Sequence, residues 1–119
     1  MLRTICISIL AFTALTSFSQ TVTTEKRWAE WGCQNIEWNN KNTSKDTIDI
    51  MVYAKRNDGT WASYIKTAIL PGESTGWMQT NGCKEKKSTG ELCVLTRVTK
   101  SKVVFPTAKE VELNGCKRE

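Results

Sequence analysis

One stretch of alternating apolar and polar residues, with a turn signal and a second such stretch after it, most constrains the fold. The apolar residues of 47–56 fall at every second position, the period of a strand with one buried face: Ile48, Ile50, Val52 and Ala54. The pair Asp58-Gly59 follows, and it tolerates the positive φ angles of a tight hairpin turn. Residues 61–70 then continue as the return strand. The pattern therefore predicts an antiparallel β-hairpin.

A two-residue Asp58-Gly59 loop would fix the register of this hairpin, because side chains alternate strictly between the two faces. It would pair Val52 with Ile65 on the inner face. The same face would hold two further pairs and one indole: Ile50 with Thr67, Ile48 with Ile69, and Trp61. The outer face would carry four residues that we treat as a candidate ligand-binding site: Tyr53, Tyr64, Met51 and Lys66. Two opposed tyrosines there would either stabilise the sheet as a cross-strand pair or form an exposed platform for a ligand.

The rest of the chain shows further short strands separated by turn signals. Leu70-Pro71-Gly72-Glu73 is typical of a type II turn. We expect strands near 74–80, 91–99, 102–105 and 111–113, and no amphipathic helix. This spacing predicts an all-β fold, a small antiparallel β-sandwich (Ig-like or similar) with about six to seven short strands. We assign it to residues 33–119 as a single domain, preceded by a partly flexible segment, 20–32.

The first residues predict export. Arg3 is the only charge before Glu25. It is followed by an apolar run over 5–12 and then by smaller, more polar residues over 13–19. This is the pattern of a signal peptide, here 1–19 with cleavage before Gln20. The apolar run is shorter than the ~20 residues that a membrane anchor needs. We therefore expect a secreted or periplasmic protein with no stable membrane span.

Four cysteines follow the expected cleavage site: Cys33, Cys83, Cys93 and Cys116. An even number in an oxidising compartment predicts two disulfides. We expect Cys83–Cys93, because it closes a short loop, together with Cys33–Cys116. A zinc site is the alternative, but no two cysteines are closely spaced and the chain has no histidine. We therefore expect neither a metal nor a cofactor.

The residues give little support to catalysis. The absence of histidine excludes a serine triad and a Cys–His dyad. Four carboxylates leave a small hydrolase open, although no pattern pairs any two of them: Asp46, Asp49, Glu73 and Glu91. We therefore expect that the chain is not an enzyme.

Five tryptophans make aromatic side chains the stronger functional lead. Their size favours burial in the core for four of them beside Trp61: Trp28, Trp31, Trp38 and Trp77. The charge is mild, with 17 basic and 12 acidic residues and no dense basic stripe, so we expect no nucleic-acid partner. Asn42-Thr43-Ser44 fits a glycosylation sequon, but we expect a solvated polar loop over 39–46 without a glycan.

Three functional hypotheses follow. The first is a non-catalytic binding module for an extracellular glycan or protein, which would bind through the tyrosine-bearing face. The second is a small secreted inhibitor or toxin-like effector that uses the Cys83–Cys93 loop. Three lysines there would meet an acidic cleft or an anionic surface: Lys84, Lys86 and Lys87. The third, a carboxylate-dependent hydrolase, has the least support.

Overall fold

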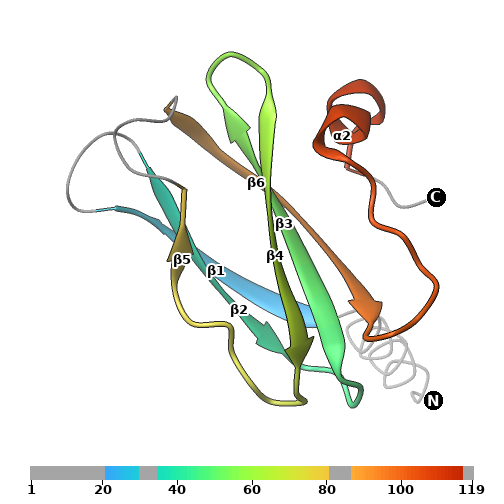
Figure 1. Ribbon diagram of the computed structural model, residues 1–119. Coiled ribbons are helices and arrows are strands. Elements are labelled where there is room, and N and C mark those ends of the chain that lie inside the picture. The colour runs from blue at the N-terminus through green and yellow to red at the C-terminus, as the bar shows by residue number, and fades with distance from the viewer. Residues whose placement is uncertain (1–20, 30–34, 81–86, 117–119) are drawn as a thin grey trace, which may run out of the picture.

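The computed structural model describes residues 21–29, 35–80 and 87–116, which form two antiparallel sheets and a short helix (Figure 1). The first sheet has the order β1-β2-β5, and its strands are β1 (Val22–Trp28), β2 (Ile36–Asn42) and β5 (Met78–Gln79). The second has the order β4-β3-β6, with β3 (Ile48–Arg56), β4 (Trp61–Ile69) and β6 (Ser88–Val98). The expected all-β class is confirmed. The expected signal peptide, 1–19, lies outside the described residues.

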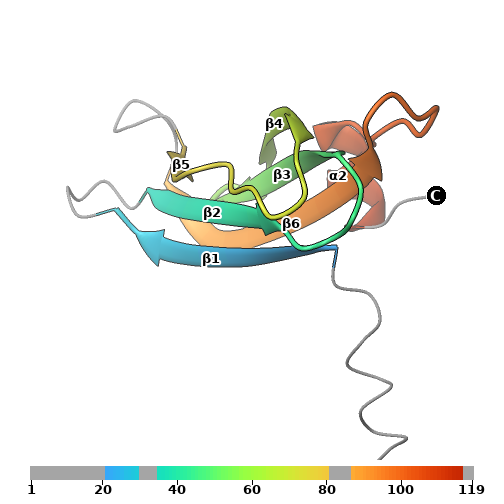
Figure 2. The same cartoon turned by 90° about the horizontal axis from the view of Figure 1, so that it is seen from below.

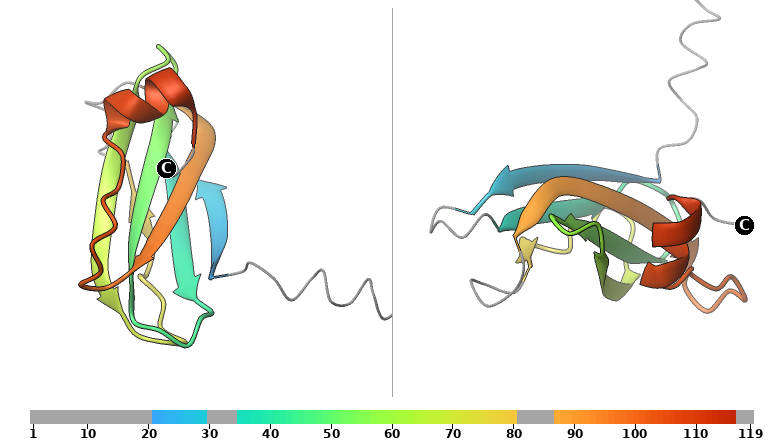
Figure 3. Two further views of the ribbon diagram at one scale, coloured as in Figure 1. Left: turned by 90° about the vertical axis from the view of Figure 1, so that its right-hand side faces the viewer. Right: turned by 90° about the horizontal axis from the view of Figure 1, so that it is seen from above.

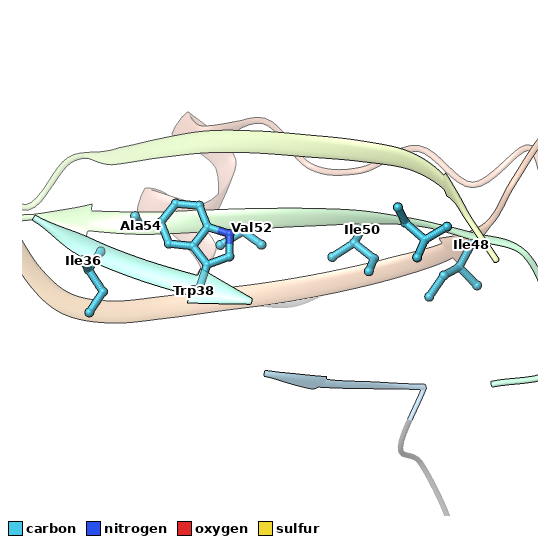
Figure 4. Close-up of a cluster of buried hydrophobic side chains, with 7 residues drawn as sticks. Ile36, Trp38, Ile48, Ile50, Val52 and Ala54 are labelled. Atoms are coloured by element: carbon cyan, nitrogen blue, oxygen red, sulfur yellow. The ribbon is translucent and has the colours of Figure 1, made fainter. Parts of the chain in front are cut away.

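Side chains of both sheets meet in one core. β2 contributes Ile36 and Trp38, and the second sheet contributes the predicted inner face of β3 and one residue of β4: Ile48, Ile50, Val52, Ala54 and Ile69. Figure 4 shows Trp38 reaching from β2 toward β3. Figure 2 shows β1 and β4 on opposite sides of this arrangement. The burial predicted for Trp38 and for alternate residues of β3 is therefore confirmed.

The hairpin between β3 and β4 has a different register from the expected one. Lys55 pairs with Trp61 and Val52 pairs with Tyr64, because the loop has three residues, 57–59, and the Arg56 N–H donates to the Thr60 carbonyl at 2.7 Å. Within the loop 57–59, only Gly59 has a positive φ, 91°, which fits a turn closed by one left-handed glycine. The Asp58 carboxylate accepts hydrogen bonds from the Thr60 N–H at 3.0 Å and hydroxyl at 2.6 Å. These bonds stabilise the longer loop, so the predicted two-residue loop is wrong.

A bulge restores the expected register at the other end of the hairpin. Ile48 pairs with Ile69 as predicted, whereas Ile50 pairs with Lys66 instead of Thr67. Ala68, in the bulged part of β4, has a positive φ of 57°. Between the loop and the bulge every β4 side chain is shifted by one position. Ile65, predicted to be buried, is therefore 44% exposed, and it pairs with Met51.

The last part of the chain forms a helix where a strand was expected. α2 (Ala108–Asn114) begins with a capping box. The Thr107 hydroxyl accepts from the Glu110 N–H at 3.1 Å, and the Glu110 carboxylate accepts from the Thr107 N–H at 2.7 Å. These reciprocal bonds satisfy two donors of the first turn and favour the helix over the strand predicted at 111–113. Residues 102–105 are not a strand either.

α2 packs on the outer face of the second sheet (Figure 3). Its buried residue, Val111, joins Tyr53 of β3 and Cys93 of β6, and Trp61 and Met51 pack against this cluster. Trp61 is therefore half-buried on the face of the sheet that α2 covers, and it does not lie on the predicted inner face.

The disulfide in the described residues joins Cys93 to Cys116, with Cα atoms 5.9 Å apart. Both expected pairings, Cys83–Cys93 and Cys33–Cys116, are therefore wrong. Proximity along the chain favours Cys83–Cys93 in an unfolded chain. In the fold, α2 returns over the second sheet and carries Cys116 to the middle of β6.

β1 lies within segment 20–32, which was expected to be partly flexible. It pairs with β2 along its whole length, from Val22 opposite Asn42 to Trp28 opposite Ile36. Its charged residues suit the edge of a sheet, because charge discourages pairing with another chain. Alternation places Lys26 and Trp28 on the side of β1 that faces the second sheet.

Candidate binding groove

An open groove of about 450 Å³ lies between β1 of the first sheet and β6 of the second. The first sheet contributes Lys26, Trp28 and Ile36 to its lining, and Arg27 borders it. The start of β6 contributes Thr89, Gly90 and Glu91. The groove therefore combines one strand edge from each sheet, and its two walls are more than 50 residues apart in the sequence.

Trp28 is the main apolar surface of the groove, and it is 51% exposed. Its six-membered ring lies against Gly90, where a Cβ atom would come within 3.0 Å of Trp28 Cζ2. Gly90 also has a φ of 88°, a region that residues with a side chain rarely adopt. Glycine is therefore needed here both for the backbone conformation and for the close approach of the indole.

Polar residues line the groove beside the indole. The Lys26 Nζ donates to the Gly90 carbonyl at 2.9 Å, which ties the edge of β1 to β6. Thr89 Oγ1 donates to the Lys55 carbonyl at 3.2 Å and accepts from the Glu91 N–H at 3.1 Å. The Glu91 carboxylate lies 3.7 Å from Lys55 Nζ, and both side chains are substantially exposed. The ammonium of Lys26 thus lies beside the groove, whereas the side chains of Thr89 and Glu91 alternate with Gly90 and contact Lys55 on the other face of β6.

The predicted tyrosine platform is not formed. Tyr53 is fully buried at the α2 side of the second sheet, and its hydroxyl donates to the Pro106 carbonyl at 2.6 Å. Tyr64 lies on the opposite face, with its ring centroid 5.2 Å from that of Trp38. Met51 shares the face of Tyr53, whereas Lys66 is exposed and shares the face of Tyr64. The structure therefore does not bring these four residues together.

The predicted lysine loop is only partly described. Lys84 and Lys86 lie outside the described residues, and Lys87 is exposed. The Lys87 carbonyl accepts from the Asn57 N–H at 2.8 Å, so this backbone lies beside the hairpin turn. The disulfide that was expected to close the loop is replaced by Cys93–Cys116.

The four carboxylates proposed for a hydrolase have different surroundings. Asp49 is 3% exposed and paired with Arg97, with Nε and Oδ2 2.8 Å apart. Glu73 accepts from the Leu70 N–H at 2.9 Å and supports the expected turn, in which Gly72 has a φ of 81°. Asp46 is exposed, and Glu91 lines the groove. Within the described ranges, no three histidine, cysteine or acidic residues cluster closely enough to hold a metal ion.

The side chain of Asn42 is part of the fold and does not lie in a solvated loop. It is fully buried at the end of β2, where its Nδ2 donates to the carbonyls of Asp46 at 2.7 Å and Ile69 at 2.9 Å. Its Oδ1 accepts from the N–H and hydroxyl of Ser44. The amide nitrogen of the sequon is thus engaged and buried in the folded protein.

The exposure of two tryptophans was not predicted from the sequence. Trp28 and Trp77 were expected in the core, but they are 51% and 43% exposed. Trp31 lies outside the described residues. A signal was present for Trp28, because the charged run Glu25-Lys26-Arg27 precedes it and marks an edge strand. Nothing comparable marks Gly90 as its partner.

No family model, curated protein or solved structure matches this chain. Among residues 21–29, 35–80 and 87–116, no helix is both long and apolar enough to cross a membrane.

Proposed function

We propose that this chain is an exported, non-catalytic binding module that holds a saccharide in the groove between β1 and β6. One observation carries the proposal: Trp28 is half exposed, inside a concave site, with its ring supported by Gly90. Large exposed aromatic groups in a groove are typical of binding surfaces, whereas scattered single apolar residues are not.

The chemistry around Trp28 favours a saccharide over a protein partner. A sugar ring has an apolar face that stacks on an indole and hydroxyl groups that need both donors and acceptors. Lys26 supplies a donor beside the indole, and Thr89 and Glu91 border the groove with polar side chains that turn to the other face of β6. The volume of about 450 Å³ falls in the ~300–1,000 Å³ range of small-ligand sites. A stable protein interface would need about 800 Å² per partner, an area much larger than the lining of this groove.

The proposal includes a finer description of the fold, a small β-sandwich. Two antiparallel sheets that share one core support it. Two observations support export of the protein: the N-terminal pattern of residues 1–19 and the use of cysteine in a disulfide.

A second disulfide, Cys33–Cys83, completes this description. Both cysteines lie outside the described residues, but the strands that lead to them are paired. Trp38 of β2 is opposite Met78 of β5, and the Thr80 N–H donates to the Ile36 carbonyl at 3.3 Å. Cys33 is five residues before Trp38 and Cys83 is five residues after Met78. Because Cys93 pairs with Cys116, these two cysteines are the ones left of the four that follow the expected cleavage site.

Calorimetric titration of the oxidised, exported protein with a panel of oligosaccharides tests the function. We expect Trp28→Ala to weaken binding at least about tenfold, because stacking on an aromatic ring contributes ~1–3 kcal/mol. Leu113→Ala is the matched control, since Leu113 is exposed on α2, away from the groove. Equal binding by Trp28→Ala and the wild type would overturn the proposal, and so would capture of a protein by this groove with no saccharide bound.

A further inference from the structure

A second exposed indole lies on the other face of the first sheet. Trp77 immediately precedes β5 and is 43% exposed. The guanidinium carbon of Arg27 lies 3.7 Å from the centre of the Trp77 ring. In the register of β1 and β2, Arg27 stands directly opposite Glu37, and its Nε donates to Glu37 Oε1 at 2.7 Å. Arg27 also borders the groove, but its side chain points to the other face of β1 from Trp28, because adjacent residues of a strand point to opposite faces.

These two contacts fix the position of the guanidinium group. Stacking on Trp77 sets the plane of the group, and the bond to Glu37 orients it within that plane. Arg27 is nevertheless 55% exposed, and no described residue forms a hydrogen bond with its two Nη nitrogens. Arginine normally loses rotamer entropy when it binds a ligand, and a side chain that is already held loses less of it.

Such a guanidinium is suited to one kind of group. Its two Nη donors form a planar fork that matches the two oxygens of a carboxylate. Trp77 and Gln79 lie on the same side, because residues two apart in an extended chain share a face. Gln79 is exposed and stands directly opposite Glu37 in the register of β2 and β5. The net charge is +5 for the whole chain and +4 without Arg3 of the expected signal peptide, which further favours an anionic ligand.

We propose that the outer face of the first sheet binds the carboxylate of an acidic saccharide through Arg27, with a sugar ring against Trp77. The saccharide class rests on the proposed function, whereas the carboxylate rests on the geometry of Arg27. An acidic peptide would supply the same carboxylate but has no ring face to stack on the indole, so a saccharide fits this surface better.

Titration of the oxidised protein with tri-galacturonate and with its methyl ester tests this proposal. The ester keeps the sugar rings and removes the charge. We expect the wild type to bind the acid at least about tenfold more tightly than the ester in low salt. Arg27→Lys should lose most of this preference although it keeps a positive charge, because lysine lacks the planar fork. Trp28→Ala should keep the preference, since Trp28 belongs to the groove.

The outcomes separate the two proposals, provided that the urea midpoint shows each variant to be folded. Equal binding of acid and ester would overturn the carboxylate site and leave the groove proposal standing. A preference kept in Arg27→Lys would also overturn it, since charge alone would then explain binding. Binding of an oligoglutamate peptide in place of the saccharide would assign the surface to a peptide and contradict the inference. Loss of all saccharide binding on Trp28→Ala would support the groove and refute a second site.

Discussion

Asp49 is a buried charge that organises one end of the second sheet. Its Oδ1 accepts hydrogen bonds from the Ala68 N–H at 3.0 Å and the Thr99 hydroxyl at 2.7 Å, and its Oδ2 accepts from Arg97 Nε at 2.8 Å. Arg97 also donates to the Val103 carbonyl at 2.8 Å. The carboxylate therefore holds both the bulge at Ala68 and the segment after β6, which gives it a structural role.

This network predicts a loss of stability in acid. Burial alone would raise the pKa of Asp49, but hydrogen bonds from Arg97, Ala68 and Thr99 and the charge of Arg97 outweigh it and lower that pKa. The stability that the carboxylate contributes is therefore fully present above the ordinary aspartate pKa of ~3.9 and is lost as the pH falls through the folded-state pKa. We expect the free energy of unfolding in urea to fall between about pH 4 and pH 2.

Asp49→Asn provides the control for this pH dependence. The variant should be less stable than the wild type at pH 7 by about 2 kcal/mol, because Arg97 loses its charged partner. It should also lose the part of the acid dependence that belongs to Asp49. An unchanged pH dependence in this variant would show that other carboxylates cause the loss.

At the scale of single elements, β3 was predictable and its partner strand was not. Alternation of Ile48, Ile50 and Val52 is a local signal, and it identifies the buried face correctly. The register of β4 depends on two features that alternation does not contain. One is the length of the loop, which the hydrogen bonds of the Asp58 side chain decide. The other is a bulge at Ala68, a residue with no special preference for positive φ.

The helix shows a different failure. Thr107 and Glu110 form the Thr-x-x-Glu pattern of a capping box, so a local helix signal was present. The alternation of Val111 and Leu113 is also typical of a short strand, but of these two residues Val111 is buried and Leu113 is 73% exposed. The groove was beyond local patterns altogether, because the contact between Trp28 and Gly90 depends on how two sheets meet.

The covalent link of α2 to β6 gives a prediction for this element. The double variant Cys93→Ser, Cys116→Ser should be less stable by about 3 kcal/mol, because the disulfide closes a loop with a sequence separation of 23. Hydrogen exchange should increase most in α2, since Val111 is its only buried residue.

Peptide mapping of the oxidised protein without reduction provides the direct chemical check. We expect one peptide pair that contains Cys93 and Cys116 and a second that contains Cys33 and Cys83. A Cys83–Cys93 pair would contradict the described fold of α2. A free thiol at Cys33 or Cys83 would contradict only the proposed second disulfide.

In the molecule as a whole, the two exposed tryptophan side chains lie on different faces of the first sheet. Trp28 lies in the groove between the sheets, and Trp77 lies with Arg27 on the outer face of the first sheet. The opposite side of the molecule is closed by α2, which covers Tyr53 and packs with Trp61. Exposed indoles thus lie on or beside the first sheet, and the function that we propose belongs to this side.

A solution NMR titration of the oxidised, ¹⁵N-labelled protein with the tightest-binding neutral saccharide tests this central claim most directly. We predict that the indole N–H resonance of Trp28 and the amide resonances of Gly90 and Glu91 shift the most, because these residues line the groove. The amide of Ile65, on the outer face of the second sheet, should not move. Shifts centred on Ile65 and its neighbours in β4, with Trp28 unchanged, would contradict the groove as the binding site.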